Sequence, residues 1–184
     1  MGYCSKLLPL VLALCLVASS CTTEALKTKV TRLQFFLHDN AGIPNPDTIL
    51  VARRLDNFNS SDPVEAAFGN VFVRDNPLTL TPDINSKLIG RSQGIAALSS
   101  HHNERSLLNA VTFVFNGAFN GSSVSVVGRN PVLNEVRELP IVGGTGIFRL
   151  ATGFMLLRTH SITPADAVIG YNVTIIHYPN LNYF

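Results

Sequence analysis

The sequence predicts an all-β protein, either an antiparallel barrel or a sandwich. Short apolar or alternating segments recur at fairly even intervals, and turn residues bound each of them. No segment combines a sustained 3.6-residue hydrophobic period with helix caps. The 184 residues suit one domain, and 13 Gly and 10 Pro interrupt the chain too often for long helices.

The first four expected strands differ in the signal that predicts them. Residues 33–38 are rich in aromatic side chains, and residues 48–53 are apolar and β-branched. Residues 70–74 alternate apolar and polar side chains and are expected to stop at Asp75-Asn76-Pro77. Residues 88–98 form a mixed run that contains two glycines.

The second half of the chain continues the same pattern. Residues 110–115 lead toward Asn120-Gly121, a strong hairpin signal, and residues 122–127 return with Ser alternating with Val. Residues 136–142 precede Gly143-Gly144-Thr145-Gly146, which predicts a tight turn with positive φ. Two further runs, 148–159 and 168–178, complete eight or nine strands.

The first 25 residues are typical of a secretory signal peptide. Lys6 precedes an apolar run of twelve residues, Leu7–Ala18, which is too short to span a bilayer. Small residues follow, so cleavage is expected between positions 20 and 25, leaving 26–184 as the mature domain. A buried hairpin segment is the alternative. Cleavage would remove only Lys6 and Glu24 from the charged residues, so the mature domain stays poor in charge.

The cysteines and the glycosylation signals both bear on this secreted domain. Cys4, Cys15 and Cys21 all lie within the predicted signal peptide, so the mature domain is expected to be held together by packing rather than disulfides. Three Asn-X-Ser/Thr sequences predict glycosylation sites at Asn59, Asn120 and Asn172.

Composition and missing motifs exclude several classes of function. Charged residues make up 14% of the chain against a usual ~25%, and the net charge is +2, which disfavours disorder, coiled coils and nucleic-acid binding. The sequence has no nucleophile elbow, zinc-protease helix, Walker loop or dinucleotide fingerprint. The adjacent pair His101-His102 would either point its rings to opposite faces of a strand or lie in a loop, and no metal site is predicted there.

Four polar residues stand out because they lie in or beside apolar strands: Asp39, Arg91, Asn130 and Arg137. In an apolar lumen, a carboxylate and an arginine would have each other, water or a ligand as partners. Burial would raise the pKa of the aspartate and a nearby arginine would lower it, so it could serve as an acid or base near neutral pH. The alternative is a salt bridge at the rim or a turn residue at a strand end.

The chain resembles the plant dirigent proteins over nearly the whole predicted mature domain. Each matching block is weak alone, but six of them occur in order at the spacing of the family. The blocks are Phe35–Asp39, Asp75–Thr79, Ser86–Gly94, Val127–Val132, Val136–Gly146 and Gly170–Thr174, the last followed by His177-Tyr178.

The resemblance implies an eight-stranded antiparallel β-barrel with a central apolar cavity, secreted to the plant apoplast. It also implies a homo-oligomer, with a trimer favoured over a dimer. Dirigent proteins use no cofactor and oxidise nothing themselves. A separate laccase or peroxidase generates phenoxy radicals, for example from coniferyl alcohol, and the dirigent protein imposes regio- and stereoselectivity on their coupling in lignan biosynthesis.

Site residues carry over by position. Asp39 and Arg137 match cavity residues of the family, and Asn130 stands where pinoresinol-forming members commonly have a second aspartate. If Asp39 faces the lumen, strand alternation places Phe35 and Leu37 there too. Ala96 and Leu98 follow Gln93-Gly94, where such members carry tyrosines, and are expected in the substrate pocket.

These departures keep two other functions open. One is a dehydratase that closes a ring through a quinone methide, as in pterocarpan formation, with Asp39 as its acid–base group. The other is a defence or cell-wall binding protein without chemistry.

Overall fold

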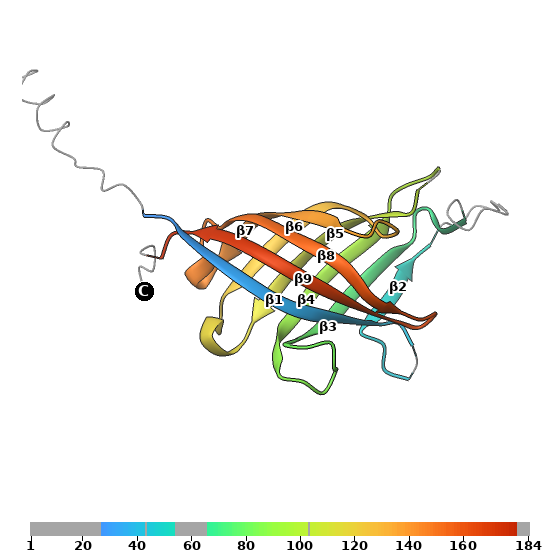
Figure 1. Ribbon diagram of the computed structural model, residues 1–184. Helices are drawn as coiled ribbons and strands as arrows, with labels where there is room; N and C mark the ends of the chain where they lie inside the picture. Colours follow the sequence, from blue (N-terminus) through green and yellow to red (C-terminus); the bar gives the residue numbers. More distant parts are fainter. Residues whose placement is uncertain (1–26, 43, 54–65, 103, 180–184) are drawn as a thin grey trace, which may run out of the picture.

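The computed structural model describes residues 27–42, 44–53, 66–102 and 104–179. The predicted signal peptide, its cysteines and the sequon at Asn59 lie outside these residues. Nine strands form one antiparallel sheet (Figure 1). Their bounds are β1 Lys29–Asn40, β2 Thr48–Ala52, β3 Val71–Thr79, β4 Leu88–Leu98, β5 Ser106–Phe115, β6 Ser123–Pro131, β7 Arg137–Thr145, β8 Thr152–Ile162 and β9 Asp166–His177. Among the described residues, no helix has the length and apolar character needed to cross a membrane.

Eight of the strands close into a barrel, which confirms the predicted architecture. The sheet order runs from β1 through β9 and down to β3, and β1 then pairs with β3 through Phe36↔Thr79 and Leu37↔Leu78. The short strand β2 pairs with the same edge of β3 in its N-terminal part, beginning at Thr48↔Arg74. β1 and β2 therefore share one edge of β3. We call the place where β2 replaces β1 the seam, and beyond Leu37 strand β1 no longer pairs with β3.

Strand β3 is longer than the sequence predicts. Asp75-Asn76-Pro77 does not end it, because these residues continue in register with β4 through Pro77↔Arg91. Proline is tolerated at a position where one edge of the strand lacks a partner. Pro77 lies between the last pair that β3 makes with β2 and the first pair it makes with β1.

The Gly143–Gly146 segment does not form the tight turn that the sequence predicts. Gly143, Gly144 and Thr145 continue β7, and only Gly146 adopts a positive φ, of 59°. Gly146 begins a 3-10 turn, η2 (Gly146–Phe148), which leads into β8. Gly144 is required by close approach, since a Cβ there would lie 2.7 Å from the Ser123 carbonyl oxygen. The Asn120-Gly121 hairpin is confirmed, with η1 (Gly117–Phe119) before it and φ of 76° at Gly121.

Side chains fill one end of the barrel. Phe35 lies in the middle of this packing, with its ring centroid 5.3 Å from Tyr171, 5.9 Å from Phe113 and 6.2 Å from Phe115. Phe148 from η2 is fully buried and closes this end of the barrel. Its ring centroid lies 5.8 Å from that of Phe115. Aromatic rings bury large areas and prefer such tilted contacts, so this end supplies much of the stability.

The first and last described strands meet at this packed end. Lys29 at the start of β1 pairs with His177 at the end of β9, and the chain leaves the barrel there (Figure 1). His177 is buried, and its Nδ1 donates to the Ile147 carbonyl oxygen at 2.9 Å. Its Nε2 therefore accepts from the Thr31 hydroxyl, also at 2.9 Å.

Substitution of Gly94 tests whether the barrel wall requires glycine at this position. Its φ is +151°, and a Cβ there would meet the Ala110 carbonyl oxygen and lie 2.7 Å from Val111 Cα. We expect Gly94→Ala to lower the free energy of unfolding by about 1–3 kcal/mol, because both the backbone strain and the collision must be accommodated. Gly143→Ala is the matched control, since a Cβ at Gly143 meets nothing within 4 Å. Equal denaturant midpoints for the two variants would contradict the explanation.

Candidate functional site

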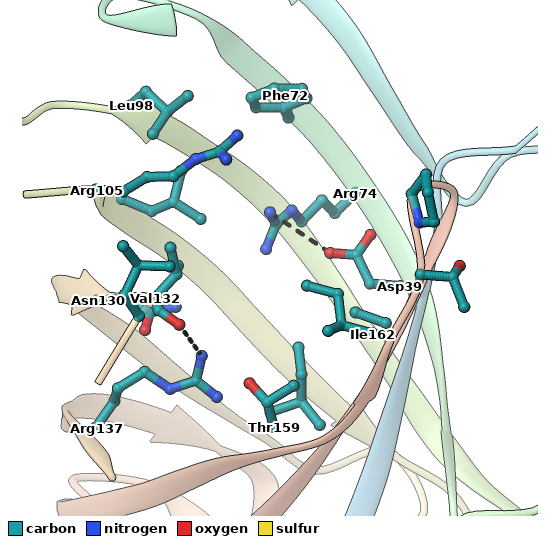
Figure 2. A pocket seen from close by; sticks show the side chains of 16 residues that line it. Asp39, Phe72, Arg74, Leu98, Arg105, Asn130, Val132, Arg137, Thr159 and Ile162 are labelled. Carbon is teal, nitrogen blue, oxygen red and sulfur yellow. Dashed lines mark hydrogen bonds and ion pairs between the residues drawn. The ribbon is translucent and has the colours of Figure 1, made fainter. Parts of the chain in front are cut away.

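A cavity of about 400 Å³ opens at the end of the barrel opposite the packed rings (Figure 2). That volume falls within the range of about 300–1,000 Å³ usual for small-molecule sites. Its walls combine apolar side chains with four charged ones. The lining residues are Asp39, Phe72, Arg74, Leu98, Arg105, Leu107, Asn130, Val132, Leu133, Arg137, Thr159, Ile162, Thr163, Pro164, Ala167 and Ile169.

Asp39 forms the first polar group of the cavity, together with residues from the seam. The Thr48 hydroxyl donates to Asp39 Oδ1 at 2.5 Å, and Asn76 Nδ2 donates to Thr48 Oγ1 at 3.0 Å. Arg74 Nη2 lies 3.6 Å from Asp39 Oδ2. Because β2 takes the place of β1 beside β3, Thr48 lies where it can fix the orientation of this carboxylate.

Arg137 and Asn130 form a second polar group, on the opposite wall (Figure 2). Arg137 is only 4% exposed, and its Nη1 donates to the Val132 carbonyl oxygen at 3.3 Å. Its Nε and Nη2, and Oδ1 of Asn130, have no partner in the described part of the chain. Burial lowers the pKa of the Arg137 guanidinium, and the nearby Tyr171 partly opposes this effect.

Tyr171 is one of the packed rings and lies within electrostatic reach of two cavity arginines. Its ring stacks on Phe35, and burial raises the pKa of its hydroxyl to about 12. Arg74 and Arg137 oppose this rise in pKa, which places both guanidinium groups within electrostatic reach of the phenol. Tyr171 is therefore a neutral phenol whose ring belongs to the aromatic core.

The structure brings together Asp39, Asn130, Arg137 and Leu98, as the sequence predicts for residues of one cavity. Phe35 and Leu37 do face inward, but they lie deeper, in the packed core. Ala96 is fully buried in a smaller cluster with Leu98 and Leu107. None of Phe35, Leu37 and Ala96 is among the lining residues of the cavity.

The remaining sequence candidates lie outside the cavity. Arg91 is on the outer surface, where Nε is 2.5 Å from Asp75 Oδ1 and Nη2 is 3.3 Å from Asp47 Oδ1, and the hydrogen bond to Asp75 is the main reason its pKa is raised. Asn120 and Asn172 are both exposed, the first in the β5–β6 turn and the second on the outer face of β9.

His101 and His102 contact each other in the β4–β5 loop, through Nδ1 and Nε2 at 2.7 Å. Within the described ranges, no three His, Cys, Asp or Glu side chains gather as metal ligands.

Three site residues were not predicted from the sequence: Arg74, Arg105 and Tyr171. The alternation in residues 70–74 places Phe72 and Arg74 on one face, so that signal could have identified Arg74. Arg105 precedes β5 and carries no such signal. Tyr171 belongs to an apolar strand, where a tyrosine is typical of the core.

The fold and cavity together define a closed antiparallel barrel with a cavity at one end. The family model described as dirigent-like protein matches residues 30–176. The chain is 45% identical over 157 residues to dirigent protein 23 of Arabidopsis thaliana, covering 84% of this chain and 81% of that one. It is 42% identical over 152 residues to pterocarpan synthase 1 of Glycine max, covering 80% and 79%.

A solved structure of a pterocarpan synthase dirigent protein superposes with a TM-score of 0.75 at 36% identity. The superposition covers 84% of this chain and 88% of the pterocarpan synthase chain. The chain belongs to the dirigent family, as the sequence motifs indicate.

Arg137 should reduce the stability of the fold, because a buried cation with unpaired donors loses its hydration without full compensation. We expect Arg137→Met, which keeps the length of the side chain, to raise the free energy of unfolding by about 1–3 kcal/mol. Arg158→Met is the control, because Arg158 is exposed and pairs with Glu135 on the surface. Denaturant titration measures both variants, and a marked loss of stability in Arg137→Met would contradict the prediction.

Proposed function

We propose that the protein directs the coupling of two phenoxy radicals, supplied by a separate laccase or peroxidase from a phenol such as coniferyl alcohol. The supporting observation is the pair of polar groups on opposite walls, Asp39 with Arg74 and Arg137 with Asn130, separated by apolar side chains. Each group can hold the oxygens of one phenol, and the apolar walls between them accommodate the rings.

The role of the barrel in this reaction is orientation. Each radical contributes one electron to the new carbon–carbon bond, so the coupling step needs no oxidant beyond the one that made the radicals. Holding both rings in one geometry makes the reaction effectively unimolecular and fixes the faces that meet. Arg137 would hold a phenolic or quinone-methide oxygen through its planar fork of donors.

Asp39 would serve the step after coupling. When a side-chain hydroxyl adds to a quinone methide, the hydroxyl loses a proton and the quinone-methide oxygen gains one. A carboxylate oriented by Thr48 can accept the first of these protons. Asn130 cannot share this role, because an amide neither donates nor accepts a proton at neutral pH.

A second candidate is a dehydratase of the pterocarpan synthase type. It is favoured by the similarity to a pterocarpan synthase over most of the chain and by Asp39 being the acidic residue of the cavity lining. In this reaction a protonated Asp39 would give its proton to a benzylic hydroxyl, which leaves as water, while the conjugated phenol loses its proton and becomes a quinone methide. A second phenol oxygen then adds to the methide carbon and its proton passes to the quinone-methide oxygen, and the proton released in the first step restores Asp39. A defence or cell-wall binding protein without chemistry is the third alternative.

Secretion to the apoplast, glycosylation and self-association belong to the same proposal. Asn120 and Asn172 are exposed and open to modification.

An apolar row on the outer surface supports self-association. Strands β2 to β6 form this row by pairing Ile49, Val73, Ile95, Ala110 and Val127 in turn. Ile95 and Val127 are nearly half exposed, at 47% and 48%. Such an apolar face favours contact with another copy of the chain, whereas Asn172 lies on β9, across the barrel.

The function is tested by oxidant-driven coupling over a panel of phenols, with chiral chromatography of the products. The wild-type protein should give an enantiomeric excess, and Arg137→Ala and Asp39→Asn should each reduce it to near racemic, because each removes one holding group. Arg129→Ala is the control, since Arg129 is exposed and pairs with Glu104. Unchanged excess in Arg137→Ala would refute the coupling role. Turnover of a benzylic alcohol without any oxidant would favour the dehydratase.

Self-association is tested with Ile95→Asp, which places a charge in the middle of the apolar row. We expect this change to convert the wild-type oligomer into a monomer in sedimentation experiments, because a carboxylate is costly to bury without a partner. Val30→Asp alters a similarly exposed residue on β1 and should leave the mass unchanged. A wild-type monomer, or an oligomer insensitive to Ile95→Asp, would exclude this surface.

A further inference from the structure

We propose that the preferred substrate of the cavity is a phenol that also carries a carboxylate, held between Arg105 and Arg137. This inference rests on the proposed function, because it names the substrate class for the same cavity. It concerns an added anionic group on the substrate, whereas coniferyl alcohol is neutral.

The charge balance of the cavity is the first observation. Its lining contains three arginines, at positions 74, 105 and 137, and one acidic residue, Asp39. Asp39 is already engaged by Arg74 and by Thr48. Arg105 and Arg137 therefore contribute two positive charges that no carboxylate of the lining neutralises.

Arg137 also has free bonding capacity. Its Nε and Nη2 are buried and without a partner among the described residues, and its Nη1 reaches only the Val132 carbonyl oxygen. Buried donors normally have partners, so two unpaired ones on a single guanidinium indicate a missing acceptor. A carboxylate fits this fork with two parallel hydrogen bonds, whereas a phenol oxygen is a single atom.

Val132 links the two arginines. Its backbone N–H donates to the Arg105 carbonyl oxygen at 3.0 Å, and its own carbonyl oxygen accepts from Arg137. The segment before β5 and the start of β7 are thereby joined at one residue, and both side chains line the same cavity (Figure 2). Arg137 lies inside and Arg105 lies exposed at the mouth, so an anion that enters passes one cation and reaches the other.

The rest of the cavity suits the aromatic part of such a molecule. Phe72, Leu98 and Leu107 supply apolar surface beside the arginines. Asp39 lies across the cavity from Arg137 and can accept a hydrogen bond from a phenol. A molecule with a carboxylate at one end and a phenol at the other would place its carboxylate on Arg137 and its ring against this apolar surface, which leaves Asp39 for the phenol of the second molecule.

The test is calorimetric titration of the full mature protein with four probes. They are 4-hydroxy-3-methoxycinnamate, its methyl ester, cinnamate without the phenol, and acetate. We expect the acid to bind at least about tenfold more tightly than its ester, and this preference to fall as salt is added. Arg105→Gln should reduce the preference while ester binding is retained. Arg129→Gln, which removes an exposed positive charge outside the cavity, should not change it.

Each outcome decides between the two proposals. Equal affinities for acid and ester, or a preference that Arg105→Gln leaves intact, would overturn the carboxylate site and leave the coupling role untouched. Acetate binding as tightly as the acid would also overturn it, because the site would then take small anions rather than a phenol. Carboxylate-selective binding without stereochemical bias for any phenol would retain the site and refute the coupling role.

Discussion

The uneven pairing of strands around the closed barrel is the constraint on which the rest of the molecule depends. β1 and β3 pair directly only near the packed end, and β2 then takes the place of β1 along the edge of β3. Across the barrel, the register pairs of β6 and β7 run only from Ser123↔Thr145 to Val126↔Ile141. The barrel is thus tightly closed at one end and widened at the other, and the widened end is where the cavity lies. Asp39 lies beside the region where β1 and β3 do not pair, and Arg137 lies beside the region where β6 and β7 do not pair.

The two ends of the barrel have opposite physical roles. At one end, large apolar rings exclude water and contribute stability, and glycines such as Gly144 allow the backbones to approach closely. At the other end, the buried Arg137 is expected to reduce stability, because its hydration is lost and only partly replaced. A protein without disulfides in its described part can tolerate this cost because the packed end compensates for it. Tyr171 belongs to the packed end, yet its hydroxyl lies within electrostatic reach of Arg74 and Arg137 at the other.

Much of this organisation could be predicted from the sequence, and the exceptions have physical causes. The family resemblance predicts cavity positions for Asp39, Asn130 and Arg137, and all three line one cavity. Alternation along a strand then determines which other residues share a face, and Phe35 and Leu37 do face inward. Alternation says nothing about depth, and for that reason Phe35 and Leu37 were expected to line a cavity although they lie in the core beneath it.

Arg105 illustrates a second limit. It reaches the cavity from a segment before β5, through contacts with the β6–β7 turn that no local pattern encodes. Pro77 illustrates a third, because whether a proline ends a strand depends on the neighbouring strands rather than on the proline itself.

The meeting of Lys29 and His177 at the packed end has a practical consequence. Because the described chain enters and leaves the barrel on the side away from the cavity, a fusion partner or surface tether attached at either point leaves the mouth accessible. Immobilised barrels of this design could therefore be arrayed beside an oxidase without blocking substrate entry. Their rims could be varied in libraries while the attachment stays the same.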